Sequence, residues 1–132
     1  MADMTAAKSA KDLVKAARQE VKHLSVDEVA EQLAQGCVLV DLREEDERRR
    51  DGVIAGAIHV PRGMLEFIAD PDSPSHRAEF VREKPLILHC ASGGRSALAA
   101  STLKTMGYGQ VAHLEGGFKA WKQQGQDTTP AD

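Results

Sequence analysis

The chain has 132 residues, of which 42% are hydrophobic and only 4% aromatic, and this predicts one compact domain with an aliphatic core. Its formal net charge of −3, spread over scattered residues of both signs, argues against nucleic-acid binding, which requires a basic surface. No segment is apolar for long enough to span a bilayer, and residues 1–20 lack the hydrophobic block of a secretory signal, so we expect a cytoplasmic protein with no membrane partner.

The first predicted element is an amphipathic helix near the N-terminus. Apolar residues recur at helical spacing at Leu13, Val14, Ala17 and Val21. An apolar stripe of this kind is usually a packing surface. We therefore expect a helical extension over residues 1–21 that docks on its own domain or, alternatively, on a partner.

A short helix with both ends marked follows this extension. Ser25 and Glu28 have the spacing of a capping box. Apolar residues then continue at helical spacing from Val26 to Leu33, and Gly36 provides the C-terminal cap. The pattern predicts a helix between Ser25 and Gly36.

Four short apolar segments are predicted as strands, and runs of this kind are typical of strands buried on both faces of a parallel sheet. They cover residues 37–40, 57–60, 86–88 and 111–114. Helical patterns occupy residues 99–106 and 118–121, and the Pro-rich segment 71–74 is expected to be a loop. Strands that alternate with helices predict an α/β fold with a mainly parallel sheet. We assign residues 22–124 to the domain and residues 125–132 to a flexible tail.

Ligands of parallel sheets bind beyond the carboxyl ends of the strands. Asp41 and Cys90 both occupy such positions. Cys90 is followed by small residues, a cation and a second hydroxyl group: Ala91, Ser92, Gly93, Gly94, Arg95 and Ser96. Glycines allow successive N–H groups to turn inward as an anion nest, and the next helix directs its positive end at the same point.

A cysteine beside such a nest is expected to ionise easily, because helix N-termini and cations lower a thiol pKa from its usual value of about 8.5. The same N–H groups can hold a persulfide anion. Cys90 is therefore interpreted as a nucleophile. Cys37 opens an apolar strand with no such loop after it, so it is interpreted as a packing residue, and both thiols are expected to be reduced.

Histidines are not expected to act on Cys90 or to bind metal. His89 precedes Cys90, and adjacent strand residues point to opposite faces, so a structural role is favoured. The other four lack metal-ligand spacing: His23, His59, His76 and His113. The sequence thus predicts no metal site.

The charged run over residues 43–51 is explained mainly as a solvated helix. Three pairs of opposite charge have helical i,i+4 spacing: Glu44–Arg48, Glu45–Arg49 and Asp46–Arg50. Asp41, Arg43 and Glu47 are set apart as supporting site residues because they lie beside a predicted strand end.

Four segments together resemble the rhodanese domain family: residues 40–43, 52–61, 90–96 and 115–121. The resemblance covers about residues 22–124. It implies a five-stranded, mainly parallel sheet with helices on both faces. It also implies a thiosulfate sulfurtransferase-type enzyme that moves sulfane sulfur through a cysteine persulfide, with no metal or organic cofactor. The chain departs from the family at Val53 and Ala55, where members often have histidine and proline.

The resemblance gives roles to individual residues. It implies that Cys90 is the nucleophile and that Ala91 to Arg95 supply backbone donors. Arg95 would bind the donor anion or brace the loop. Asp41 and Arg43 would occupy supporting positions. Thiosulfate is the first expected donor, followed by mercaptopyruvate, polysulfide and glutathione persulfide. The acceptor is expected to be cyanide or a thiol, including a protein thiol.

Other functions remain open at this point. A phosphatase or arsenate reductase on a related fold has five residues between cysteine and arginine, whereas only four separate Cys90 from Arg95. A non-catalytic persulfide carrier or binding module is a further alternative, although inactive members typically lack the cysteine. A redox sensor is also conceivable, because a thiolate of low pKa is prone to oxidation; no resolving cysteine is evident in the sequence, although Cys37 could lie close in space.

Overall fold

The computed structural model describes residues 6–131, so the parts of the predicted extension and tail at residues 1–5 and 132 lie outside it. Five strands form one sheet in the order β1-β5-β4-β2-β3, and every neighbouring pair is parallel. The strands are β1 Lys22–Leu24, β2 Val38–Asp41, β3 Ile58–His59, β4 Leu86–His89 and β5 Val111–Leu114. The predicted α/β fold is confirmed, and the sheet is parallel throughout.

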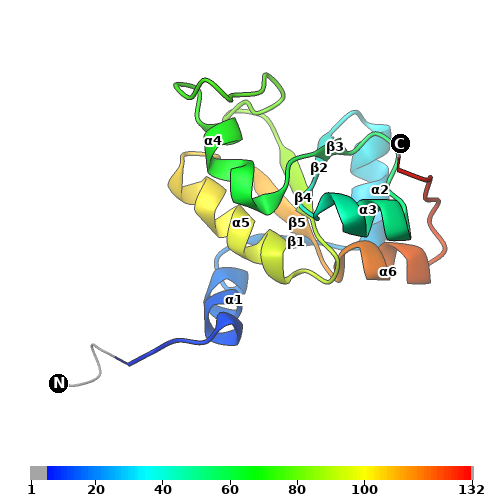
Figure 1. Cartoon of the computed structure of the whole chain (residues 1–132), viewed down its shortest axis with the longest axis horizontal. Helices are drawn as coiled ribbons and strands as arrows, with labels where there is room; N and C mark the ends of the chain where they lie inside the picture. The colour runs from blue at the N-terminus through cyan, green and yellow to red at the C-terminus, as the bar shows by residue number, and fades with distance from the viewer. Residues whose placement is uncertain (1–5, 132) are drawn as a thin grey trace.

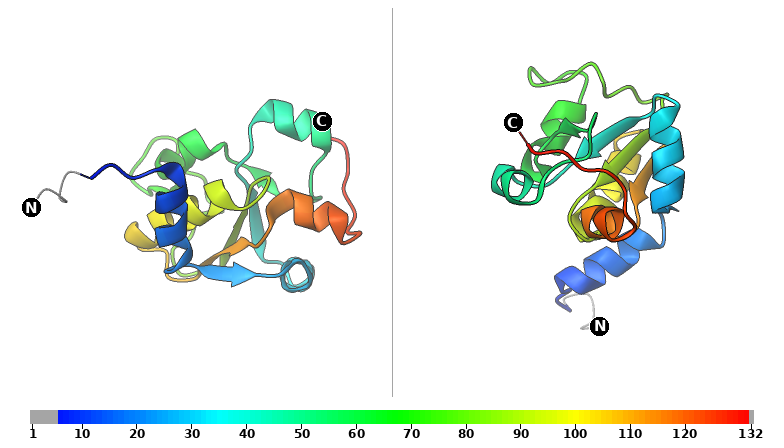
Figure 2. Two further views of the ribbon diagram at one scale, coloured as in Figure 1. Left: turned by 90° about the horizontal axis from the view of Figure 1, so that it is seen from below. Right: turned by 90° about the vertical axis from the view of Figure 1, so that its right-hand side faces the viewer.

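Helices cover both faces of the sheet (Figure 1). They are α1 Ala10–Arg18, α2 Val26–Ala34, α3 Glu45–Asp51, the short 3-10 helix η2 Arg62–Met64, α4 Leu65–Ala69, α5 Gly94–Thr105 and α6 Gly117–Gln123. Figure 2 shows α4 and α5 on one side of the sheet and α2 and α6 on the other.

The two faces of the sheet carry separate hydrophobic clusters because side chains alternate along each strand. Val40 and Leu88 pack with α4 and α5 on one face. Leu39 and Ile87 pack with α2 and α6 on the other. Because β4 lies in the middle of the sheet, the residue that follows it is held between both layers.

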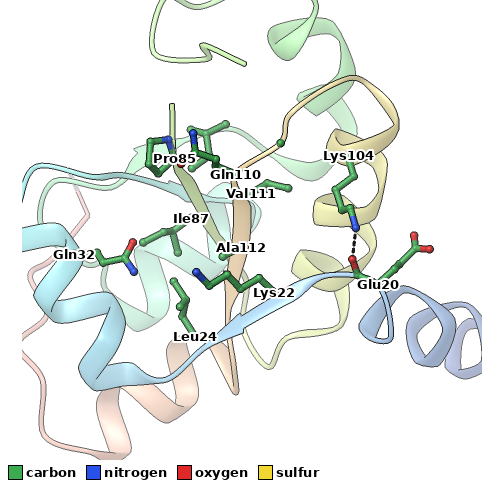
Figure 3. A pocket seen from close by; sticks show the side chains of 12 residues that line it. Glu20, Lys22, Leu24, Gln32, Pro85, Ile87, Lys104, Gln110, Val111 and Ala112 are labelled. Carbon is green, nitrogen blue, oxygen red and sulfur yellow. Dashed lines mark hydrogen bonds between the residues drawn. The ribbon is translucent and has the colours of Figure 1, made fainter. Parts of the chain in front are cut away.

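The N-terminal helix α1 docks on its own domain. A capping box between Ser9 and Asp12 starts the helix, and Ala17 is buried where α1 packs on α5. Beyond the helix, Lys104 of α5 donates a hydrogen bond to the carbonyl oxygen of Glu20 (Figure 3). The docking predicted from the apolar stripe is confirmed, although Leu13 stays 48% exposed.

The C-terminal segment returns along the surface of the domain. Thr129 and Val53 form an antiparallel bridge, with hydrogen bonds of 2.7 and 2.9 Å between their backbones. The indole Nε1 of Trp121 donates to the carbonyl of Asp127 at 2.9 Å. These contacts join α6 to the turn that follows α3.

A cavity of about 430 Å³ lies near the amino ends of β1, β5 and β4 (Figure 3). Its lining includes Lys22, Pro85 and Gln110, which lie at or just before the beginnings of β1, β4 and β5. Cys90 lies at the opposite ends of the strands, so this cavity takes no part in the site described below. Among residues 6–131, no helix combines the length and the apolarity needed to cross a membrane.

The charged run differs in its pairing from the sequence expectation. Residues 45–51 form α3, but within this described segment only the Glu45–Arg49 pair of the three predicted pairs forms. Arg48 instead turns toward the sheet and contacts Asp41 at 3.2 Å. The physical reason is that a buried carboxylate attracts a cation more strongly than a solvated one does.

Candidate active site

Cys90 is the first residue beyond the central strand β4. The register places His89 beside Asp41, so the ends of β2 and β4 meet at one edge of the sheet. Cys90 is 99% shielded from solvent, with only 1% of its surface exposed. The chain then turns through residues 91–93 into α5, which brings the start of that helix against the sulfur.

Two backbone amides, one from the loop and one from the first turn of α5, point at the Cys90 sulfur. The N–H of Gly93 lies 3.1 Å from Sγ, and that of Ser96 lies 3.4 Å from it. Gly93 adopts φ +114°, a left-handed conformation that favours glycine and turns its amide inward. The first turn of α5 adds its positive end. The site is therefore built to hold negative charge on sulfur.

Helix α6 fixes the outer side of this loop. The amides of Phe118 and Lys119 donate to the carbonyls of Cys90 and Ala91 at 2.8 and 3.0 Å. Gly117 permits this approach, because a Cβ there would lie 2.6 Å from the Cys90 oxygen. With its carbonyls drawn to α6, the loop presents its N–H groups to the sulfur.

Arg95 is engaged by Glu47 of α3. Two hydrogen bonds of 2.8 Å join the guanidinium to the carboxylate. The bonds from Arg95 lower the pKa of Glu47 to about 2, and those from Glu47 raise the pKa of Arg95. This geometry braces the start of α5 against α3.

Asp41 and Arg43 form a buried ion pair beneath the same edge. Arg43 Nε and Nη2 donate to Asp41 at 3.0 and 2.8 Å, and Nη2 also donates to the Gly52 carbonyl. The guanidinium lies 4.0 Å from the Phe118 ring centre. Burial acts to raise the pKa of Asp41, but the hydrogen bonds from Arg43 outweigh it and bring that pKa to about 2. Through the Phe118 ring, the pair lies next to the residue whose amide donates to the Cys90 carbonyl.

His89 points to the other face of the sheet, as the strand alternation predicts. It is fully buried, stacks on Phe118 with ring centres 6.2 Å apart, and its Nε2 has no hydrogen-bond partner among the described residues. Burial lowers its pKa to about 4, so the ring is neutral near pH 7. His89 is a structural residue of the core and not the base for Cys90.

The suggestion that Cys37 lies close to Cys90 is wrong. Cys37 precedes β2, whereas Cys90 follows β4 at the opposite end of the paired strands. The four residues of β2 separate them by roughly 13 Å along the strand direction, too far for a disulfide. Both cysteines are free, and burial raises the pKa of Cys37. Its packing against the α2 side of the core supports the structural interpretation.

The side chains that contact Ser96 from behind the loop were not predicted from the sequence. Ser96 is fully buried, and its Oγ lies 2.8 Å from Nδ1 of His113. One ring nitrogen each of His23 and His113 and one carboxylate oxygen of Glu115 lie within 4.8 Å of one another. Parallel pairing of β1 with β5 places His23 opposite His113. That register could have revealed the group, but β1 has only three residues and was not predicted.

Replacing Gly93 by alanine is expected to weaken the site selectively. A side chain at φ +114° costs about 1–2 kcal/mol and turns the 93 amide away from Sγ. We expect at least a tenfold loss in the rate of Cys90 alkylation at pH 7. Gly63→Ala is the matched control, because no atom lies within 4 Å of a Cβ at that position. Equal rates in both variants would contradict the role of the Gly93 amide.

Acid is expected to destabilise the protein through Asp41 and Glu47. Both pKa values are lowered on folding to about 2, so their stabilisation is complete above about pH 5 and is lost as the pH falls toward 2. Each carboxylate contributes on the order of 2 kcal/mol at neutral pH. Urea unfolding at several pH values measures this. Glu47→Gln should unfold with a shallower pH dependence, and a slope equal to the wild type would count against the Glu47–Arg95 pair.

Comparison with known proteins agrees with this geometry. Residues 25–124 match the rhodanese-like domain family. A sulfurtransferase from Allochromatium vinosum is 29% identical over 107 residues, covering 80% of this chain and 92% of that protein. The thiosulfate sulfurtransferase GlpE from Ectopseudomonas mendocina is 32% identical over 104 residues, covering 78% and 86%.

One solved structure is similar to this chain over nearly its whole length. It is a protein of unknown function from Rhodopseudomonas palustris, described as a possible tyrosine phosphatase. It superposes with a TM-score of 0.87 at 38% identity and covers 94% of this chain and 96% of that one. A rhodanese-like domain protein from Staphylococcus aureus has a TM-score of 0.65 at 25% identity, covering 82% and 98%. From its parallel sheet, its cysteine loop and the match over residues 25–124, this chain belongs to the rhodanese-like domain family.

Proposed function

We propose that the protein is a sulfurtransferase that carries sulfane sulfur as a persulfide on Cys90. The observation that carries the proposal is the pair of amides, from Gly93 and Ser96, that converge on the Cys90 sulfur. A persulfide is an anion near neutral pH, so the same electrostatic environment suits both the attacking thiolate and the product. The names of the relatives from Allochromatium and Ectopseudomonas support this assignment.

The reaction proceeds by covalent catalysis in two steps. The Cys90 thiolate attacks the outer sulfur of thiosulfate, a bond forms between the two sulfurs, and sulfite leaves with the electron pair of the broken S–S bond. A nucleophilic acceptor such as cyanide then attacks the outer sulfur. Thiocyanate forms, and the electron pair of the cleaved bond returns to Cys90 as a thiolate.

The loop favours a small donor that places one sulfur atom at its centre. Cys90 is only 1% exposed, whereas Ser92 of the same loop is exposed, and this burial of the thiol favours a small donor. The remaining amides of residues 91–95 would surround the outer sulfur of the persulfide. Thiosulfate is the donor we favour. The acceptor we favour is a small or protein-borne thiol of the cytoplasm, where thiols are kept reduced.

A phosphatase is the second candidate because of the similar structure from Rhodopseudomonas palustris. Two observations favour sulfur over phosphate in this chain. Only four residues separate Cys90 from Arg95, which makes a tight loop, and the Arg95 guanidinium is held by Glu47 through two bonds of 2.8 Å. A phosphoryl group presents several oxygens that need a wider ring and a free arginine.

A turnover assay separates these candidates. Purified protein is incubated with thiosulfate and cyanide, and thiocyanate is measured; mercaptopyruvate, polysulfide and glutathione persulfide are tested as further donors. Phosphotyrosine-type substrates and arsenate with a thiol reductant are tested in parallel. We expect sulfur transfer and no phosphate release. Phosphate release or arsenate reduction without turnover of any sulfur donor would reject the proposed function.

A further inference from the structure

A continuous chain of hydrogen bonds runs from the Cys90 sulfur to helix α1. The Sγ atom lies 3.6 Å from Ser96 Oγ, which lies 2.8 Å from Nδ1 of His113. Nε2 of His113 is 2.8 Å from Nδ1 of His23, and Nε2 of His23 is 2.8 Å from the carbonyl oxygen of Arg18. The chain thus crosses α5, β5 and β1 before it ends on α1.

The last link gives the bonds before it one consistent direction. The Arg18 carbonyl can only accept, so Nε2 of His23 carries a proton and its Nδ1 accepts from His113 when the ring is neutral. The remaining nitrogen of His113, at 2.8 Å, then accepts the hydroxyl proton of Ser96 in preference to the Gly93 carbonyl, which lies farther away at 3.2 Å. The oxygen of Ser96 is left to accept from the thiol of Cys90.

His113 and His23 differ in burial, and this suits them to different roles in the chain of hydrogen bonds. His113 is fully buried, and its burial, with the nearby His23 second, lowers its pKa to about 4. A neutral His113 can accept at one nitrogen and donate at the other. His23 has a side chain that is 32% exposed, so a proton that reaches it can exchange with water.

Glu115 supplies the negative charge that a protonated His23 needs. Its Oε1 lies 3.2 Å from Nδ1 of His23. Arg18 donates to both oxygens of this carboxylate, at 2.9 and 2.6 Å, and these bonds lower the pKa of Glu115. Helix α1 therefore holds both the final acceptor of the chain and the counter-ion beside it.

We propose that Ser96, His113 and His23 form a proton relay that removes the thiol proton of Cys90 and delivers it to the surface beside α1. The S–H bond breaks with its electron pair left on Sγ, each bond in the chain passes on one proton, and a new N–H forms at Nδ1 of His23. The step needs no oxidant or reductant. Ser96 contacts the reacting sulfur, whereas His113 and His23 act as positioning residues through it.

The relay deepens the proposed function, since it explains how a buried thiol with no base on its own strand becomes a nucleophile. It also extends the site beyond the family match, because His23 and Arg18 precede residue 25. The charged groups that face the relay are Lys11, Lys15 and Arg18 of α1, Glu115 after β5 and Arg95 of α5.

The test is the pH profile of Cys90 alkylation by iodoacetamide, followed by peptide mass in buffers that contain EDTA. Rates are normalised to the plateau at high pH, and Cys37 serves as an internal reference. While the proton stays on His23 beside Glu115, the thiolate and the protonated ring stabilise each other through the chain. Losing either histidine removes that stabilisation, so we expect His23→Ala and His113→Gln to raise the midpoint of the profile by about one pH unit, which makes alkylation about tenfold slower at pH 6. The plateau and the Cys37 profile should stay unchanged.

Two further measurements separate a relay from a packing effect. Imidazole in the buffer is expected to restore the low-pH rate of His23→Ala, because that position reaches the surface. His76→Ala, at a half-buried histidine in the loop after α4, is the matched control and should behave like the wild type. A wild-type midpoint in both relay variants, a rate that falls equally at every pH, or a failure of imidazole to rescue would each overturn the relay. Alkylation uses no sulfur donor, so a protein with an intact relay profile and no sulfur transfer would contradict the proposed function alone.

Discussion

Cys90→Ser is expected to abolish sulfur transfer, with thiocyanate formation reduced by roughly 10³-fold or more. A serine hydroxyl is not ionised near neutral pH and cannot form a persulfide. The amides of Gly93 and Ser96 can still donate to an oxygen at this position, so the fold should be retained. The thiosulfate–cyanide assay measures the loss, and thermal unfolding confirms that the variant is folded.

Cys37→Ser is the matched control for this loss. Cys37 lies at the other end of the strands and is only half-buried. We expect it to keep the wild-type rate. Activity that survives in Cys90→Ser, or that disappears in Cys37→Ser, would be incompatible with Cys90 as the sulfur carrier.

The largest expected loss of stability follows replacement of Arg43. Its side chain is 1% exposed and neutralises Asp41, which is fully buried. In Arg43→Met the carboxylate loses both guanidinium bonds and keeps the backbone N–H of residue 43, at 3.1 Å, and the contact from Arg48, at 3.2 Å. Removing one partner of a buried pair typically costs about 3–5 kcal/mol. We expect a loss of this size in the free energy of unfolding, measured by urea denaturation.

Two controls accompany Arg43→Met: one removes a cation at an exposed position, and the other removes the buried negative charge as well. Arg49→Met removes an exposed arginine from the same helix, α3, and should change stability by less than about 0.5 kcal/mol. Asp41→Asn combined with Arg43→Met removes the buried charge as well and should recover part of the loss. A loss below about 1 kcal/mol in Arg43→Met alone would show that water or Arg48 satisfies Asp41.

The architecture was predictable wherever a local pattern was strong. The apolar run at residues 111–114 matches β5 residue for residue, and Ser25 with Glu28 forms the capping box expected at the start of α2. The loop after Cys90 was also predictable, because a left-handed backbone position favours glycine and the sequence has Gly93 at that position. Helix α5 begins at Gly94, earlier than its apolar pattern indicates, since its first turn serves the sulfur and not the core.

The features that depend on neighbouring strands were not predictable. Strand β1 has three residues and gains its stability from pairing with β5, and α4 has five residues. Charge partners were missed for the same reason. Arg48 forms an ion pair with Asp41, and Glu47 forms one with Arg95. The partners belong to different elements, so the spacing of charges along one helix does not predict these pairs. The contact between His23 and His113 exists only because β1 lies beside β5.

The central claim is that Cys90 holds a single sulfur atom, and intact-mass analysis after treatment with thiosulfate tests it most directly. The wild type should gain the mass of one sulfur atom, located at Cys90 by peptide mapping and lost again when cyanide is added. An unchanged mass after treatment with thiosulfate and every other donor, or an added sulfur that maps to Cys37, would contradict the account.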